Sequence, residues 1–307
     1  MEKKPYSAAG DRLWQWRNDA LKQARQHDVP PEEVDWLLQE CAGLDRLSLR
    51  LMTNRSQAEV SLRCSVETLH ELWQKRLGDR TPIQYLAGTT PWRTFEMRVS
   101  PAVLIPRPET ELIIDIAVAQ TRHNPSLRQG HWVDLGTGSG AIALGLAQAF
   151  PEATIHAVDC SHEALAIAQY NAQQNGLGDR IRFYQGEWFD PLPQLKHQIS
   201  GVVSNPPYIP SADLPNLQVE VFRHEPLLAL DGGSDGLSSV RYLVESSPIY
   251  LTAGGIWLVE LMAGQAQTVQ HLLQQEGYGA IATHSDLAGI ERFVSAQAPL
   301  KEAECGS

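Results

Sequence analysis

The chain has 307 residues, of which 43% are hydrophobic and 20% charged, a composition typical of a globular protein long enough for two domains. Its formal net charge of −11 argues against a protein that grips nucleic acid through phosphate contacts over a broad surface, although it leaves room for a local basic groove. The four cysteines show no Cys-x-x-Cys or zinc spacing, and no apolar run reaches membrane-spanning length. We therefore expect a cytoplasmic protein with free thiols, no metal site and no membrane anchor.

Residues 1–80 carry helical spacing rather than strand alternation. Apolar residues from Leu13 to Ala24 form one stripe, Pro30-Pro31 is typical of a helix start, and Val66 to Trp73 form a further inward face. The sequence predicts a small N-terminal helical domain, without strands, in which these stripes are core.

Residues 81–105 predict a β-hairpin linker, because Phe95–Val99 alternates as a strand and Val103–Ile105 reads as a second one. Residues 106–298 then alternate strands and helices in the rhythm of a doubly wound α/β sheet. The predicted strands are His131–Leu135, Ala153–Val158, Ile181–Tyr184, Ile199–Ser204, Gly255–Glu260 and an antiparallel pair at Ala280–His284 and Arg292–Ala296. Residues 299–307 are expected to be a disordered tail.

A glycine-rich turn, Gly136-Thr137-Gly138-Ser139-Gly140, follows the first of these strands. Its glycines permit a tight turn and close approach of the backbone to a ligand, and N–H groups at the helix start can receive polar groups. Asp159 ends the second strand about twenty residues on, where a carboxylate can bind ribose hydroxyls. Because Ala141 completes a dinucleotide fingerprint, these residues alone fit either a dinucleotide or a methyl donor.

The segment Asn205-Pro206-Pro207-Tyr208 ends a buried strand, because two prolines cannot continue its hydrogen-bond ladder. The Asn amide oxygen and an adjacent carbonyl are the two acceptors needed to hold a planar –NH2 group, and the Tyr ring can pack over it. An NAD enzyme has no need of such a motif across from its glycine loop. Together the two motifs resemble the class I S-adenosyl-L-methionine-dependent methyltransferases, with a Rossmann-like sheet, that act on planar amino or amide nitrogens.

Further motifs narrow this resemblance, and they occur in order along nearly the whole chain. They are Pro82-Ile83-Gln84-Tyr85-Leu86-Ala87-Gly88, Leu104-Ile105-Pro106-Arg107-Pro108-Glu109-Thr110-Glu111, Gly186-Glu187-Trp188-Phe189, Phe222-Arg223-His224-Glu225-Pro226 and Gly232-Gly233-Ser234-Asp235-Gly236-Leu237. With the helical domain they make the chain similar to the HemK/PrmC family of protein-(glutamine-N5) methyltransferases. The resemblance implies methyl transfer from S-adenosyl-L-methionine to a glutamine amide in the Gly-Gly-Gln motif of a peptide chain release factor.

The resemblance also implies residue roles. The methionine portion of the cofactor would contact the glycine loop, its ribose Asp159, and its adenine Trp188. The implied cofactor-binding residues are Gly136, Thr137, Gly138, Ser139, Gly140, Asp159, Trp188 and Asn205. The implied substrate-binding residues are Asn205, Pro206, Pro207 and Tyr208, of which Asn205, Pro206 and Tyr208 would be catalytic.

Some residues and functions stay open at this point. The family often has Glu-x-Gly after the fifth strand, whereas this chain reads Glu260-Leu261-Met262-Ala263-Gly264, so we assign Glu260 no catalytic role. The sequence does not decide whether Arg107 and Glu109 make functional contacts or serve as a surface salt bridge and a helix cap. We expect Cys160, beside Asp159, to be a small buried hydrophobe.

Three alternative functions are weighed. An adenine-N6 nucleic-acid methyltransferase can share the four acceptor residues and would flip its base into the pocket, but the acidic balance and the lack of a Lys/Arg-rich segment disfavour it. A sister glutamine methyltransferase that acts on a ribosomal protein is the second alternative, and a non-catalytic cofactor-binding adaptor is disfavoured by two intact motifs. The helical domain is predicted to recognise the protein partner, or else only to stabilise the sheet.

Overall fold

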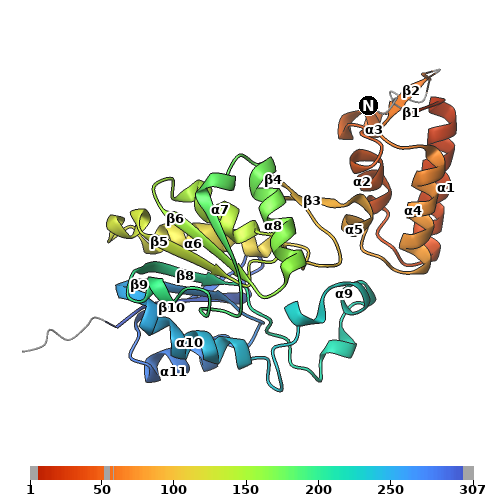
Figure 1. Ribbon diagram of the computed structural model, residues 1–307. Helices are drawn as coiled ribbons and strands as arrows, with labels where there is room; N and C mark the ends of the chain where they lie inside the picture. The colour runs from red at the N-terminus through yellow and green to blue at the C-terminus, as the bar shows by residue number, and fades with distance from the viewer. Residues whose placement is uncertain (1–5, 52–55, 58, 300–307) are drawn as a thin grey trace, which may run out of the picture. The chain divides into compact units, whose positions relative to one another are not determined.

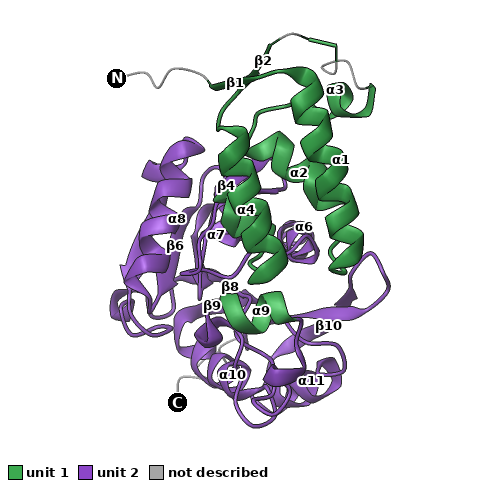
Figure 2. Ribbon diagram, turned by 90° about the vertical axis from the view of Figure 1, so that its right-hand side faces the viewer, with its two compact units in different colours: residues 1–89, 219–224 green, residues 90–218, 225–307 purple. Residues whose placement is uncertain are grey.

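The computed structural model describes residues 6–51, 56–57 and 59–299, and the chain divides into two compact units (Figure 2). The helical unit comprises residues 1–89 and 219–224, and the sheet unit comprises residues 90–218 and 225–307. Apart from its first residue, the predicted tail lies outside the described residues. No helix within the described ranges is long and apolar enough to cross a membrane.

The helical unit contains the three predicted helices and more. Its helices are α1 (Gly10–Gln26), α2 (Glu32–Glu40), α3 (Arg46–Leu51), α4 (Val66–Gly78), α5 (Ile83–Ala87) and α9 (Val219–His224). Ser65 caps α4, because its hydroxyl accepts a hydrogen bond from the N–H of Thr68 at 3.1 Å. The expectation of a domain without strands is wrong, since β1 (Tyr6–Ala8) and β2 (Val60–Leu62) pair antiparallel. Each strand has three residues, too few for alternation to be visible in the sequence.

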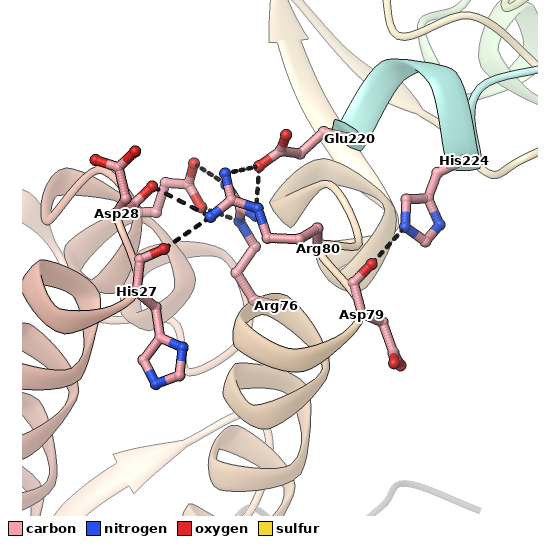
Figure 3. Close-up of polar contacts among 8 residues, drawn as sticks. His27, Asp28, Arg76, Asp79, Arg80, Glu220 and His224 are labelled. Atoms are coloured by element: carbon pink, nitrogen blue, oxygen red, sulfur yellow. Dashed lines mark hydrogen bonds and ion pairs between the residues drawn. The ribbon is translucent and has the colours of Figure 1, made fainter. Parts of the chain in front are cut away.

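Helix α9 joins the helical unit from a distant part of the sequence. Glu220 on α9 pairs with Arg76 at 2.9 Å and with Arg80 at 2.7 Å (Figure 3). Arg76 is 3% exposed and forms a second, two-pronged ion pair with Glu33. The chain therefore leaves the sheet unit at residue 218 and is fixed to the helical unit by a partly buried charge cluster before it returns at residue 225.

The sheet unit is built on seven strands in the order β10-β11-β9-β8-β5-β6-β7 (Figure 1). Their bounds are β5 (His131–Leu135), β6 (Thr154–Asp159), β7 (Ile181–Gln185), β8 (Ile199–Ser204), β9 (Leu251–Glu260), β10 (Gly279–Ser285) and β11 (Glu291–Gln297). Strands β5 to β9 pair in parallel, and β10 and β11 are antiparallel to their neighbours. Because the chain crosses from β7 at one edge back to β8, the carboxyl ends of β5 and β8 form the switch point where such sheets bind ligands. The predicted doubly wound sheet is confirmed.

Helices cover both faces of this sheet. One face carries α6 (Leu112–Gln120), α7 (Ala141–Ala149) and α8 (His162–Gln174), and the other carries α10 (Ser238–Tyr250) and α11 (Ala266–Gln275). The short 3-10 helices are η1 (Glu109–Glu111), η2 (Pro125–Gln129), η3 (Gly178–Arg180), η4 (Pro193–Leu195), η5 (Leu214–Asn216) and η6 (Leu227–Ala229). Each face has its own apolar core, with Trp132 fully buried in one and Trp257 in the other.

The predicted hairpin is present, but one of its strands differs from the prediction. It consists of β3 (Thr89–Trp92) and β4 (Phe95–Arg98), and residues 103–105 form no strand. Pro91 conceals β3 in the sequence, yet a two-stranded ribbon tolerates a proline whose missing N–H would face outward. Trp92 and Met97 are buried in the sheet unit, so the hairpin packs against its core.

Candidate functional site

The loop between β5 and α7 turns at three glycines. Gly136, Gly138 and Gly140 have φ angles of +76°, +53° and +84°, a region that only glycine adopts without strain. The N–H groups of Gly136 and Thr137 both donate to the carbonyl oxygen of Val158 at 2.9 Å. These bonds tie the loop to the end of β6 and fix the path of its backbone.

Asp159, the last residue of β6, holds the same loop. Its Oδ2 accepts a hydrogen bond from the N–H of Gly138 at 2.8 Å, and its Oδ1 accepts one from Ser161 at 2.9 Å. Burial raises the pKa of Asp159, against the opposing effect of these backbone hydrogen bonds. The neighbouring Cys160 is exposed, so the expectation that it is buried is wrong. Asp159 lines a cavity while it fixes the glycine loop.

This cavity, of about 520 Å³, opens at the carboxyl ends of the central strands. Residues 136–139 form one wall, Trp188 another, and Asn205 with Pro207 a third. The volume lies within the range of roughly 300–1,000 Å³ that small-molecule sites span. A Cβ atom on Gly136 would stand 3.8 Å from the Trp188 ring, so the slot between them is narrow. Backbone N–H groups, a carboxylate and an indole face suit the methionine, ribose and adenine parts of S-adenosyl-L-methionine.

The acceptor motif, Asn205-Pro206-Pro207-Tyr208, continues directly from β8 at the same edge of the sheet. The Ser204 hydroxyl donates to the carbonyl oxygen of Leu135 at 2.6 Å, which joins the ends of β8 and β5. Asn205 and Pro207 line the cavity, whereas Pro206 is buried. The hydroxyl of Tyr208 points instead to Glu260, donating to Oε1 at 3.4 Å.

The side chain of Asn205 is oriented by Thr110 in η1. Its Nδ2 donates to Oγ1 of Thr110 at 3.4 Å, and Thr110 is 3% exposed. Among the described residues no donor is paired with Oδ1 of Asn205. The half-buried Asn205 therefore has an acceptor available on the cavity side of the motif. Thr110 lies within a family motif, but nothing in the sequence indicates this contact.

Two carboxyl groups near the cavity were assigned no role from the sequence. Burial raises the pKa of Glu260 to about 7, and burial likewise raises that of Asp134 to about 7. Asp134 accepts hydrogen bonds from the Thr137 hydroxyl at 2.6 Å and from the N–H of Ala143 at 3.0 Å. One oxygen of each carboxyl, Oδ1 of Asp134 and Oε2 of Glu260, is buried without a hydrogen-bond partner among the described residues. An acidic residue inside an apolar strand is the only sequence signal for either.

Arg107 forms an ion pair of 2.7 Å with Glu225, whose side chain is 1% exposed. Burial raises the pKa of Glu225, and Arg107 opposes that shift. Pro106 and Pro226, next to the two partners in the sequence, line the cavity. Arg107, whose side chain is 33% exposed, thus belongs to a partly buried pair at the cavity edge, and Glu109 begins η1.

Comparison with known proteins shows which family the chain resembles. Residues 115–227 match the model of the methyltransferase small domain family. A release factor glutamine methyltransferase of Synechocystis sp. is 54% identical over 94% of this chain and 97% of its own length. One from Gloeobacter violaceus is 47% identical over 91% of this chain and 94% of its own length. Among solved structures, the hMettl16 catalytic domain in complex with MAT2A 3′UTR hairpin 6 shares the fold, with a TM-score of 0.53 and 13% identity over 77% of this chain and 81% of that chain.

Proposed function

We propose the function of this chain from the family to which it belongs, the release factor glutamine methyltransferases. The chain is an S-adenosyl-L-methionine-dependent methyltransferase that modifies the side-chain amide nitrogen of a protein glutamine. Its proposed substrate is a peptide chain release factor, methylated in the cytoplasm. The support is that relatives of this name match the chain over up to 94% of its length, which includes most of the helical unit.

One observation carries the assignment of residues: Asn205 and the glycine loop border the same cavity. The loop follows β5 and Asn205 follows β8, two strands that pair side by side. A ligand held by the loop and an amide held by Asn205 would therefore be neighbours. Group transfer requires this proximity of donor and acceptor.

The cavity residues would divide the cofactor among them. Backbone N–H groups of residues 136–140 would hold its methionine portion, Asp159 its ribose hydroxyls, and Trp188 its adenine. Bound S-adenosyl-L-methionine supplies an electrophilic methyl group on its sulfonium. The loop hydrogen bonds to Val158 and Asp159 preorganise these contacts, because they fix the path of the loop backbone.

Asn205 would orient the glutamine amide, whose nitrogen is a poor nucleophile because its lone pair is delocalised into the carbonyl. Oδ1 of Asn205 and the carbonyl of Pro206 would accept its two N–H groups. These bonds draw electron density onto the nitrogen and stabilise positive charge as it develops. Tyr208 would steady the amide plane, and the proton would leave to water.

We further propose that residues 1–80 form a recognition domain for the protein substrate, residues 81–105 a linker, and residues 106–298 the methyltransferase domain. Helix α9 is added to the recognition domain, because residues 219–224 group with it. This helix lies in sequence between the acceptor motif and α10. The recognition domain therefore includes part of the segment that connects them.

Replacing Asn205 by alanine tests the proposal. With a release factor and labelled cofactor, turnover in Asn205→Ala should fall by about 10²-fold or more, because the oriented acceptor is lost. Cofactor affinity measured by calorimetry should stay near the wild-type value. Asn216→Ala, at an exposed position in η5, is the matched control and should remain active.

Wild-type turnover in Asn205→Ala would contradict the assignment of the acceptor site. A parallel incubation with DNA and RNA separates the main rival function. Label appearing in nucleic acid and not in the release factor would reverse the ranking of substrates.

A further inference from the structure

Four polar side chains, two of them in the acceptor motif, lie next to one another. Asn205 donates to the Thr110 hydroxyl at 3.4 Å, and the Tyr208 hydroxyl donates to Glu260 Oε1 at 3.4 Å. The Thr110 hydroxyl lies close enough to the Glu260 carboxyl to lower its pKa, while Oε2 of Glu260 is buried without a hydrogen-bond partner among the described residues. Thr110 and Glu260 are 3% and 2% exposed, so water does not compete for these contacts.

The charge on Glu260 fixes which of these side chains donate hydrogen bonds and which accept them. A carboxylate only accepts hydrogen bonds, so the single hydroxyl hydrogen of Thr110 is drawn to Glu260. The Thr110 oxygen then offers only lone pairs, and the group that faces it must be a donor. That group is Nδ2 of Asn205, which leaves Oδ1 as the free end of the amide.

We propose that Glu260 is a positioning residue for methyl transfer, acting through Thr110 so that Asn205 presents Oδ1 rather than Nδ2 to the glutamine amide. The inference rests on the proposed role of Asn205. An inverted Asn205 would direct N–H donors at a substrate nitrogen that itself carries two N–H donors. Such a pair cannot form a hydrogen bond, so the orientation decides whether the acceptor binds productively.

The surroundings of Glu260 make its protonation responsive to ordinary pH. Burial raises the pKa of Glu260 to about 7. The nearby Thr110, Arg292 and Tyr208 act to lower this pKa, and Glu109 acts to raise it. Arg292 is itself paired with Asp286 at 2.7 Å rather than with Glu260. Once protonated, Glu260 can donate to the Thr110 oxygen, whose own hydrogen is then free to turn to Oδ1 of Asn205. The wild-type kcat should therefore fall as pH drops below about 7.

Two single variants test this role of Glu260, one at Glu260 itself and one at Thr110. Glu260→Gln removes the charge and Thr110→Val removes the hydroxyl, and each should lower kcat about tenfold, the effect expected of one misdirected hydrogen bond. The KM for the cofactor should stay unchanged, and the fall of kcat below pH 7 should vanish in Glu260→Gln. Thr110→Ser keeps the hydroxyl and should restore the wild-type rate and pH profile. Glu291→Gln, at an exposed position of β11, is the matched control.

The double variant separates positioning from general damage to the fold. Because Glu260 acts on Asn205 through Thr110, Glu260→Gln combined with Thr110→Val should be no slower than Thr110→Val alone. Multiplied losses, or a Glu260→Gln enzyme with the wild-type kcat and pH profile, would overturn the inference. Urea unfolding of each variant checks that it is folded under assay conditions.

Measuring Asn205→Ala beside these variants distinguishes a failure of the proposed acceptor site from a failure of the proposed role of Glu260. An active Asn205→Ala enzyme would remove the proposed acceptor site itself. An inactive one, combined with normal Glu260→Gln and Thr110→Val enzymes, would leave that site standing and remove only the role of Glu260.

Discussion

Two glutamates largely withdrawn from water, one in each unit, have opposite electrostatic surroundings. Burial acts to raise the pKa of Glu220 on α9, but hydrogen bonds and the guanidinium groups of Arg76 and Arg80 bring it below its ordinary value. Burial raises the pKa of Glu260 on β9 to about 7, and the hydroxyl that donates a hydrogen bond to it belongs to the neutral Tyr208. Ion pairs therefore compensate the carboxylate of Glu220, whereas Glu260 forms no ion pair among the described residues.

This difference separates a structural role from a functional one. The paired carboxylate of Glu220 attaches α9 to α4 through Arg76, and its lowered pKa keeps it charged over the whole neutral range. Buried carboxyls that form no ion pair among the described residues, such as Asp134 and Glu260, reduce stability and gain a tunable protonation state. Proteins tolerate such costs mainly at sites where activity needs them.

Breaking the paired side of this comparison should have the largest effect on stability. Arg76→Ala removes the common partner of Glu33 and Glu220 and leaves both carboxylates without it. The free energy of unfolding should fall by about 3–5 kcal/mol, the usual result of removing one member of a buried ion cluster. Urea denaturation followed by intrinsic tryptophan fluorescence, to which the buried Trp73 of this unit contributes, would measure this loss.

An exposed arginine in the same unit supplies the control for Arg76→Ala. Arg12 pairs with Glu67, and the two side chains are 62% and 65% exposed. Arg12→Ala should leave the unfolding midpoint unchanged within error, because water screens such pairs. Equal stability of the two variants would show that the Arg76 cluster contributes nothing.

The sequence predicts the parts of this fold whose signal lies within one continuous segment. Strands β5 and β8 are located to the residue, because each is an apolar run stopped by glycine or proline. The glycine loop and the Asn205 motif are likewise continuous segments. Short strands such as β1, and β3 with its Pro91, lack any such signal.

The parts that the sequence does not predict depend on packing between distant segments. Thr110 and Asn205 are 95 residues apart, and Tyr208 and Glu260 are 52 apart. Glu220 lies 144 residues from Arg76, and its six-residue helix carries no mark of the unit that it joins. Partners of this kind are set by the order of strands in the sheet and by the path of loops, neither of which any single motif encodes.

Removing the uncompensated charge should have the opposite effect on stability. Because folding raises the pKa of Glu260 from 4.5 to about 7, the folded state binds more protons between these values, and its stability falls as pH rises through them. Glu260→Gln lacks this loss, so its stability relative to wild type should rise by on the order of 3 kcal/mol from about pH 4 to about pH 8. Unfolding in urea across this pH range measures the difference.

Glu291→Gln, at an exposed position of β11, controls for the change in net charge. A stability difference between Glu260→Gln and wild type that stays constant with pH would show that Glu260 is compensated in solution. The contrast with Glu220 would then disappear. A rise in stability together with a slower enzyme would instead assign Glu260 to function at the expense of the fold.

The smallest effect is expected from neutralising Glu220 alone. In Glu220→Gln, Arg76 keeps Glu33 and Arg80 keeps two backbone carbonyls of residues 27 and 28, so the loss should be about 1–2 kcal/mol near neutral pH. Since folding lowers the pKa of Glu220, its contribution is present above 4.5 and lost as pH falls below that value. The advantage of wild type should therefore shrink in acid, whereas the gain of Glu260→Gln grows toward alkaline pH. Urea unfolding of Glu220→Gln and wild type near pH 4 and pH 7 measures this, and an advantage unchanged by acid would remove the distinction between the two glutamates.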